Sequence, residues 1–365
     1  MNRDIRVRYG DFDMLKKIMF FIPSLEYGGA ERVTTYLTKY FAEKEYDVML
    51  VTTSKKCVNE YVLHPFVKRE KYNKVSDING YIDTFLPDLI VIMFAPMCLS
   101  IVPIIRKYKI PYIISERNDP RNFAGKTVTR ILYQSMMCSA TGLVFQTKDA
   151  QDYYKRYRGE KKIIYNPLIL ENFPPIHDGK RKKVIVNVGR LHYQKNQKVL
   201  ICAFSKLRKN YQEYQLDIYG TGELELELKA FIHELNLEDC VFLKGNKNNV
   251  LELENDNMMF VLSSDFEGMP NALIEAMALG LPVISTDCPC GGPRELIDDH
   301  VNGTLVPVND VDALYKAMEE LIINEELRNK YSKEAIKIRE KLDEKVVLKE
   351  WEDFCNRIAN MEYKR

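Results

Sequence analysis

The sequence predicts an α/β protein of two doubly wound, Rossmann-like domains that face each other across a cleft. Short β-rich runs alternate with helical segments along most of the chain, a pattern typical of parallel sheets built from right-handed βαβ units. With 365 residues, the chain is longer than one hydrophobic core ordinarily supports. Asn-Pro, Pro-Pro, Asp-Gly and a basic run break the alternation over residues 166–183. We therefore expect two domains joined near this break.

The first domain is expected to span residues 16–172. Residues 1–15 are polar and aperiodic, so we expect a mobile tail there, with Met14 as an alternative start. A helix is predicted over residues 30–44, where apolar residues recur on one face. The strands are predicted from short apolar runs at residues 17–22, 47–52, 89–93, 112–115 and 141–145.

The second domain is expected to span residues 173–346. A helix is predicted over residues 311–324, and a last helical stretch begins near residue 343. This stretch follows an apparently complete domain, so residues 347–365 are expected to cross back onto the first domain. The strands are predicted at residues 183–188, 215–219, 241–244, 259–263, 282–286 and 303–306.

Composition excludes several protein classes. Hydrophobic residues make up 46% and charged residues 29% of the chain, which excludes a disordered or fibrous protein. The apolar runs, such as residues 89–94, are far shorter than the roughly 20 residues of a membrane-spanning helix. No signal-peptide pattern opens the chain, so we expect a cytoplasmic protein. Scattered cysteines such as Cys98 and Cys138 favour reduced core thiols, and a metal or redox pair at Cys288 and Cys290 is the weaker alternative.

Charge is distributed unevenly along the chain. Residues 1–175 contain 27 Lys and Arg against 19 Asp and Glu, whereas residues 176–365 contain 26 against 33. A basic first half suits an anionic partner such as a lipid diphosphate or a membrane surface. We expect peripheral contact of the first domain with the inner face of the cell membrane, and no nucleic-acid partner. The densest basic run, residues 155–162, is equally well explained as a solvated helix end.

The most specific segment spans residues 266–284, where a strand ends, a Gly/Pro turn follows and a short helix starts near Asn271. Backbone N–H groups at a helix start bind phosphate, so this is a natural diphosphate site. Glu267 lies in the turn, from which it can reach a sugar. Glu275 lies among apolar residues of the helix, where a carboxylate needs a partner such as a ribose diol. Two glutamates at this spacing are otherwise usually solvated helix charges. The amides of Asn271 and Ala272 are the candidate diphosphate contacts. The candidate donor-binding residues of this segment are Gly268, Met269, Pro270, Asn271, Ala272 and Glu275.

Two cations follow the first strand of the second domain. Arg190 and Lys195 lie in the segment 189–196, after Gly189. Fixed cations at the end of a strand can bind an anionic group and stabilise negative charge there. The alternative for Arg190 is a plain surface charge.

These motifs, in this order, resemble glycosyltransferase family 4 over most of residues 17–325. Glu267 and Glu275 match the E-x7-E pair of that family. The resemblance implies a GT-B fold, retention of configuration and a nucleotide diphosphate sugar donor, most often a UDP-sugar. It implies contact of Glu267 with the transferred sugar, of Glu275 with the ribose hydroxyls, and of Arg190 and Lys195 with the diphosphate.

Glycine-containing turns after other strands also match the family. Gly28 and Gly29 open the first helix, where backbone can approach phosphate closely. Gly220 lies in a second turn of this kind, which lacks the third glycine of a nicotinamide site. Gly245 and Asn246 lie where the family places the loop that contacts the base.

One segment departs from the family pattern. Many members have a histidine near the donor sugar after the fourth or fifth strand, whereas this chain has none in residues 115–120. The segment resembles that of a branch concerned with capsule and exopolysaccharide assembly. Glu116, Arg117 and Asn118 are therefore candidates for positioning the sugar or the acceptor. The branch favours a saccharide acceptor carried on a polyprenyl diphosphate.

No cofactor or metal is expected. Asp-x-Asp occurs at residues 11–13 and 310–312, but the first lies in the expected tail and Asp310 is placed to cap a helix. Two alternatives to a glycosyltransferase stay open. A sugar-nucleotide epimerase shares the GT-B architecture, and a non-catalytic sugar-nucleotide-binding partner of an assembly complex belongs to a different class.

Overall fold

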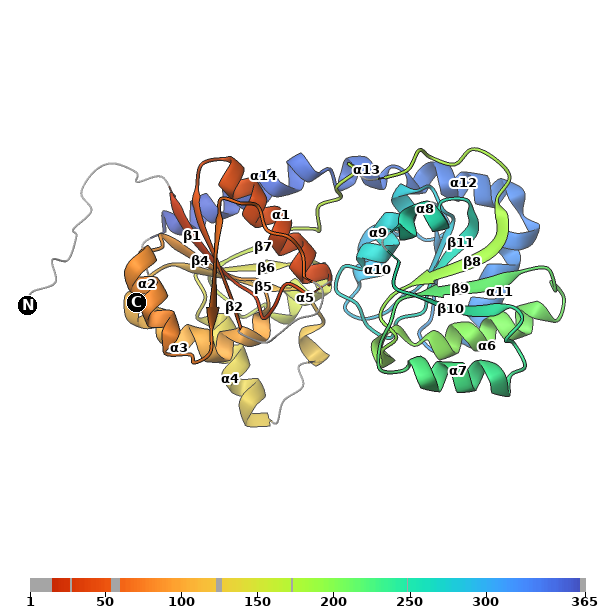
Figure 1. The fold of residues 1–365 in the computed structure, drawn as a ribbon, viewed down its shortest axis with the longest axis horizontal. Coiled ribbons are helices and arrows are strands. Elements are labelled where there is room, and N and C mark those ends of the chain that lie inside the picture. The colour runs from red at the N-terminus through yellow and green to blue at the C-terminus, as the bar shows by residue number, and fades with distance from the viewer. Residues whose placement is uncertain are drawn as a thin grey trace, which may run out of the picture.

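The computed structural model describes residues 15–26, 28–53, 60–122, 127–171, 173–247 and 249–361. Two lobes lie side by side, and each is built around a parallel sheet (Figure 1). The expectation of a two-domain, doubly wound α/β fold is confirmed. The predicted tail lies outside the described residues except for Leu15, which is buried.

The first lobe contains a seven-stranded sheet of order β3-β2-β1-β4-β5-β6-β7, in which every pairing is parallel. Strand order reverses between β1 and β4, which creates a crevice at their carboxyl ends. The strands are β1 (Lys17–Phe21), β2 (Asp47–Thr53), β3 (Val67–Tyr72), β4 (Leu89–Ile92), β5 (Tyr112–Glu116), β6 (Gly142–Phe145) and β7 (Glu160–Ile163). The helices are α1 (Gly29–Glu43), α2 (Asp77–Phe85), η1 (Ala95–Met97), α3 (Cys98–Tyr108), η2 (Pro120–Asn122), α4 (Thr127–Cys138) and α5 (Lys148–Tyr153).

The second lobe repeats the same winding, with a six-stranded parallel sheet of order β10-β9-β8-β11-β12-β13. Its crevice therefore lies between β8 and β11. The strands are β8 (Lys182–Val188), β9 (Gln215–Tyr219), β10 (Val241–Gly245), β11 (Asn257–Leu262), β12 (Val283–Thr286) and β13 (Thr304–Val306). The helices are η3 (Tyr193–Lys195), α6 (Gln197–Arg208), α7 (Glu225–Glu234), α8 (Val250–Glu254), α9 (Asn271–Ala278), α10 (Gly292–Leu296), α11 (Val311–Ile323), α12 (Glu325–Ala335) and α13 (Ile338–Lys341).

The last helix, α14 (Glu344–Ala359), leaves the second lobe and lies along the first (Figure 1). It packs against α1, β4 and β5. Trp351 and Phe354 are fully buried in the core on that face of the first sheet. Glu352 anchors the same helix, because Lys44 and Lys349 pair with its carboxylate and Tyr40 donates a hydrogen bond to it.

The predicted strands all occur, with ends shifted by one or two residues, but the sequence analysis missed β3 and β7. Both are the outermost strands of the first sheet. Their charged sequences, KREKY and EKKI, are typical of edge strands, where one side of the backbone is unpaired. Another expectation was wrong, because Cys138 is exposed rather than buried in the core. Within the part of the chain that the structure describes, no helix combines the length and apolarity needed to cross a membrane.

Candidate active site

Loops from both lobes surround one cavity of about 890 Å³. The first lobe contributes the loops that follow β1, β4 and β5, and the second lobe contributes those that follow β8 and β11. These loops lie at the carboxyl ends of the strands, where both sheets reverse their winding. The cavity therefore occupies the position that ligands take in open α/β folds.

Most residues selected from the sequence line this cavity, although they are far apart in the chain. They are Gly28, Gly29, Glu116, Arg117, Asn118, Gly189, Arg190, Lys195, Asn246, Glu267, Gly268, Met269, Pro270, Asn271, Ala272 and Glu275.

Gly220 and Gly245 are not among the lining residues. Gly220 has a φ of +130°, and a Cβ there would lie 2.0 Å from the carbonyl oxygen of Gly189. Its backbone N–H donates to Gly245 O at 3.0 Å. These two glycines therefore support the loop that begins at Gly189, and the structure gives them no direct contact with the cavity.

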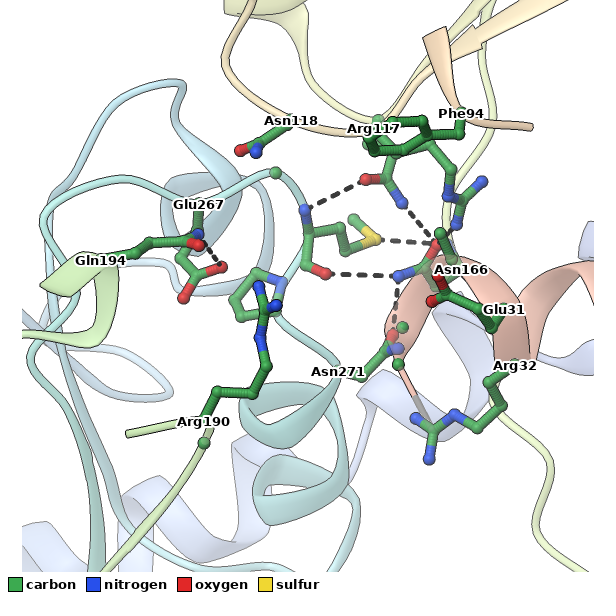
Figure 2. A pocket seen from close by; sticks show the side chains of 18 of the residues that line it. Glu31, Arg32, Phe94, Arg117, Asn118, Asn166, Arg190, Gln194, Glu267 and Asn271 are labelled. Carbon is green, nitrogen blue, oxygen red and sulfur yellow. Dashed lines mark hydrogen bonds between the residues drawn. The ribbon is translucent and has the colours of Figure 1, made fainter. Parts of the chain in front are cut away.

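Glu267 is held in one orientation on the second lobe. It follows β11, and its side chain is only 7% exposed. Lys195 Nζ donates to Oε1, Ser264 Oγ donates to the same oxygen at 2.6 Å, and Gln194 Nε2 lies 3.4 Å from Oε2. Figure 2 shows Gln194 and Glu267 on one side of the cavity. A fixed carboxylate of this kind can accept hydrogen bonds from sugar hydroxyls.

The helix α9 begins at the cavity wall. Leu273 and Ile274 donate their backbone N–H groups to Pro270 O, so the amides of Asn271 and Ala272 precede the first intrahelical bonds. No side chain caps this end of the helix. Free amides and the positive end of the helix dipole together favour an anion here.

Glu275, one turn into α9, forms an ion pair across the cleft with Arg32 of α1. Arg32 Nη1 donates to Oε1 of the carboxylate, and both side chains are partly exposed to the cavity. A partly buried carboxylate needs a partner, and the partner of Glu275 is therefore an arginine from the other lobe. No side chain of the described residues donates to the second carboxylate oxygen, Oε2, which can therefore accept from a ligand.

Arg190 places a cation on the second-lobe wall of the cavity. No Asp or Glu of the described residues lies within ion-pair distance of its guanidinium, whereas Lys195 is paired with Glu267. Figure 2 shows Arg190 pointing into the cavity, between Glu267 and Asn271 in that view. A doubly charged group near the start of α9 would therefore meet an unshared positive charge.

On the first lobe, Glu116 lies at the end of β5 and is 4% exposed. Tyr133 of α4 donates a hydrogen bond of 2.5 Å to its Oε2. Burial raises the pKa of Glu116 to about 7, and the hydrogen bonds from Tyr133 and the Asn118 backbone only partly oppose this rise. Glu116 is therefore about half protonated near neutral pH.

Arg117 and Glu31 place opposite charges on the first-lobe wall. Burial lowers the pKa of Arg117 to about 10, and attraction to Glu31 only partly opposes this decrease. Burial raises the pKa of Glu31, against the pull of Arg117 and Arg190. The guanidinium of Arg117 stays charged at neutral pH, so this wall carries a positive and an acidic group side by side.

Asn166 joins the two lobes and was missed by the sequence analysis. Its Nδ2 donates to Asn271 Oδ1 at 2.6 Å and to Met269 O at 3.3 Å, and its Oδ1 accepts from Arg117 Nη2 (Figure 2). Gly268 lies at the same contact, since a Cβ there would approach Arg117 O to 2.3 Å. Asn166 was visible only as part of the Asn-Pro break, and its role depends on how the lobes meet.

No group of three or more His, Cys, Asp or Glu side chains among the described residues could hold a metal ion. Asp310 caps α11, accepting from Ala313 N at 2.8 Å, and the other Asp-x-Asp, residues 11–13, lies outside the described chain. Cys288 and Cys290 are buried, and burial raises the pKa of both thiols to about 12.

Comparisons with known proteins agree with this geometry. The family model for glycosyl transferases group 1 matches residues 170–338. The Campylobacter jejuni protein named N-acetylgalactosamine-N,N'-diacetylbacillosaminyl-diphospho-undecaprenol 4-alpha-N-acetylgalactosaminyltransferase is 30% identical over 361 residues, which cover 91% of this chain and 97% of that protein. The chain belongs to the glycosyl transferases group 1 family.

This glycosyltransferase is also similar to an uncharacterized glycosyltransferase of Methanocaldococcus jannaschii. The two are 31% identical over 266 residues, which cover 66% of this chain and 64% of that one. A variant of S. aureus TarM, solved with fondaparinux, alpha-GlcNAc-glycerol and UDP, is 15% identical and has a TM-score of 0.80, covering 95% of this chain and 100% of that one. The predicted GT-B fold and the predicted transferase class are both confirmed.

Proposed function

We propose that this glycosyltransferase moves a sugar from a UDP-sugar, with retention of configuration and without a metal, to a saccharide carried on a polyprenyl diphosphate. We place it in the cytoplasm, in peripheral contact with the inner face of the membrane, in the assembly of a surface polysaccharide. The observation that carries the proposal is that Arg190, Lys195, Glu267 and Glu275 line a single cavity.

The second lobe supplies what a nucleotide diphosphate needs. Arg190, Lys195, Asn271 and Ala272 all line the cavity, and the amides of Asn271 and Ala272 precede the first intrahelical bonds of α9. As the glycosidic bond breaks, negative charge grows on the departing UDP, and these fixed positive groups stabilise it. The free oxygen of Glu275 accepts from the ribose diol. Support for uridine comes from the TarM structure, which contains UDP.

Glu267 orients the transferred sugar by accepting hydrogen bonds from its hydroxyls. Its three hydrogen-bond donors hold the carboxylate in place before the sugar binds, so the carboxylate needs little further ordering during the reaction. The acceptor enters from the first lobe, where Glu116, Arg117 and Asn118 position it. The acceptor oxygen bonds to the anomeric carbon on the face that the phosphate leaves, the bond from carbon to phosphate oxygen breaks, and the departing diphosphate takes the hydroxyl proton.

The acceptor class is supported by the Campylobacter relative, whose name describes a saccharide on diphospho-undecaprenol. Arg190 and Arg117 both place positive charge on the cavity wall, which suits substrates rich in phosphate. An epimerase would convert a nucleotide sugar without an acceptor, and a non-catalytic partner would have no need of a carboxylate fixed by three donors.

The test uses a labelled panel of UDP-sugars with a polyprenyl-diphosphate-linked saccharide, with thermal shift to select the donor. Transfer should require the acceptor and yield a product of unchanged anomeric configuration. Arg190→Ala and Glu267→Gln should each lower turnover by about 10²–10³-fold. Arg190→Ala should keep a melting temperature near that of the parent, whereas Glu267→Gln, which leaves Lys195 without its carboxylate, should also lose stability. Near-normal turnover in both variants, or conversion of the donor without an acceptor, would refute the proposal.

A further inference from the structure

The helix α4 presents an apolar face to solvent. Val128, Ile131 and Leu132 are 69%, 61% and 48% exposed, and Ser135 and Cys138 continue the same outward face. The spacing of these positions follows the helical period, so they form one stripe. Figure 1 shows α4 projecting from the first lobe. Large apolar side chains gathered on a projecting helix indicate a surface that is covered in use.

The opposite face of α4 belongs to the active site. Tyr133 and Met137 are buried, and Tyr133 both lines the cavity and donates to Glu116. The diameter of a helix, about 10 Å with its side chains, therefore separates the apolar stripe from the cavity. Whatever covers the stripe therefore lies within about one helix diameter of the cavity wall at Tyr133.

Positive charge lies on α4 and at its C-terminal end. No acidic residue occurs in α4, and the helix contains Arg130. Tyr157 donates to Ala140 O at 3.0 Å, which brings the turn of residues 155–158 to the end of α4. Lys155, Arg156 and Arg158 of that turn are exposed, and no described carboxylate lies within ion-pair distance of them.

Other charges near this surface do not cancel it. The acidic side chains of α5, Asp149 and Asp152, lie within ion-pair distance of Arg294 and Lys148. The neighbouring helix α3 ends in two exposed cations, Arg106 and Lys107. An apolar stripe bordered by unpaired cations matches a bilayer that carries anionic headgroups.

We propose that the outward face of α4, with the basic turn of residues 155–158, docks on an anionic lipid bilayer and holds the first-lobe entrance of the cavity over the membrane surface. Ile131 and Leu132 enter the headgroup layer, while Arg156 and Arg158 contact lipid phosphates. The inference rests on the proposed function in one respect, since a lipid-linked acceptor gives the docking its purpose. It identifies the densest basic run of the sequence as part of a binding surface.

The test measures co-sedimentation of the full chain with vesicles of phosphatidylglycerol and phosphatidylcholine in equal parts, and with phosphatidylcholine alone. The parent protein should bind the anionic vesicles preferentially. The double variant Ile131→Gln, Leu132→Gln should bind them at least about tenfold more weakly, because two apolar side chains no longer enter the interface. The double variant Arg156→Gln, Arg158→Gln should bind more weakly and with a smaller salt dependence.

The matched control is Leu226→Gln, Ile323→Gln, which removes two apolar side chains from the second lobe that are more exposed than Ile131 and Leu132, at 81% and 68%. This control should bind vesicles like the parent. Equal binding by the control and the α4 variant, or no vesicle binding by the parent, would overturn the proposal. A dimer of the parent in light scattering that the α4 variant abolishes would also overturn it, since a second copy would then cover the stripe. Vesicle binding needs no turnover, so failure of the proposed reaction is recognised separately.

Discussion

Replacement of Lys195 by alanine should lower both the stability and the turnover of the enzyme, because it removes the contact of Lys195 with Glu267. Lys195 pairs with Glu267, and their side chains are 15% and 7% exposed. Without the ammonium group, the Glu267 carboxylate keeps only Ser264 Oγ and Gln194 Nε2 as donors. Breaking a buried pair by removing one partner costs about 3–5 kcal/mol of folding free energy. Because two donors remain, we expect Lys195→Ala to lose folding free energy near the lower end of this range, about 3 kcal/mol.

Turnover should fall by more than instability can explain. Loss of a fixed cation beside the departing diphosphate predicts a decrease of about 10²–10³-fold in kcat. The assay compares donor turnover with the free energy of unfolding from denaturant titration. The double variant Lys195→Ala, Glu267→Gln should recover part of the lost stability, since no unpaired carboxylate is left, but none of the lost turnover.

The matched control is Lys44→Ala. Lys44 pairs with Glu352, a carboxylate that is 8% exposed and lies far from the cavity, between α1 and α14. This variant should lose stability and keep its turnover. If Lys195→Ala keeps near-normal turnover, or if both variants lose turnover in proportion to stability, the assignment of Lys195 to the departing diphosphate is wrong.

Three further predictions follow from the contacts described above. Glu116→Gln should flatten the pH dependence of stability. The pKa of Glu116 is raised from 4.5 to about 7, so the parent should lose about 3 kcal/mol of unfolding free energy as the pH rises from about 4.5 to about 7. Denaturant titration between about pH 4.5 and about pH 8 should show this loss in the parent and not in the variant. Gly268→Ala should push the lobes apart, because the new Cβ would lie 2.3 Å from Arg117 O. Small-angle scattering should then report a larger radius of gyration, and an unchanged radius with intact donor affinity would contradict this. Trp351→Ala should lower the free energy of unfolding by about 3–5 kcal/mol, because this side chain of α14 is fully buried against the first sheet. Denaturant titration measures the loss, and a loss under about 1 kcal/mol would show that α14 does not stabilise the lobe.

The elements that determine the fold could be predicted from the sequence, because a buried parallel strand is a short apolar run. Such a run can be recognised without knowing which strands lie next to it. The edge strands β3 and β7 could not, since their charged residues face solvent and resemble loop sequence. The solvent exposure of Cys138 and of the apolar stripe of α4 could not be predicted either, because these residues are apolar. An apolar run predicts burial, and only the packing of α4 shows which of its faces is buried.

The candidate site was predicted in part for the same reason. Arg190, Lys195, Glu267 and Glu275 belong to local motifs at the ends of strands, so their arrival at one edge follows from the topology. Contacts between the lobes have no such local signal. Arg32 and Glu275 are separated by 243 positions, and the hydrogen bonds of Asn166 join residues up to 105 positions away. These pairs depend on the relative placement of two independent cores.

Calorimetric titration of UDP into the parent protein and into Arg190→Ala tests the central claim most directly. The claim is that the unshared guanidinium of Arg190 and the start of α9 bind a nucleotide diphosphate in the cavity between the lobes. A charged hydrogen-bonding group at a phosphate predicts at least about tenfold weaker UDP binding to Arg190→Ala. Equal affinity of both proteins for UDP, or no heat of binding with the parent, would contradict the account.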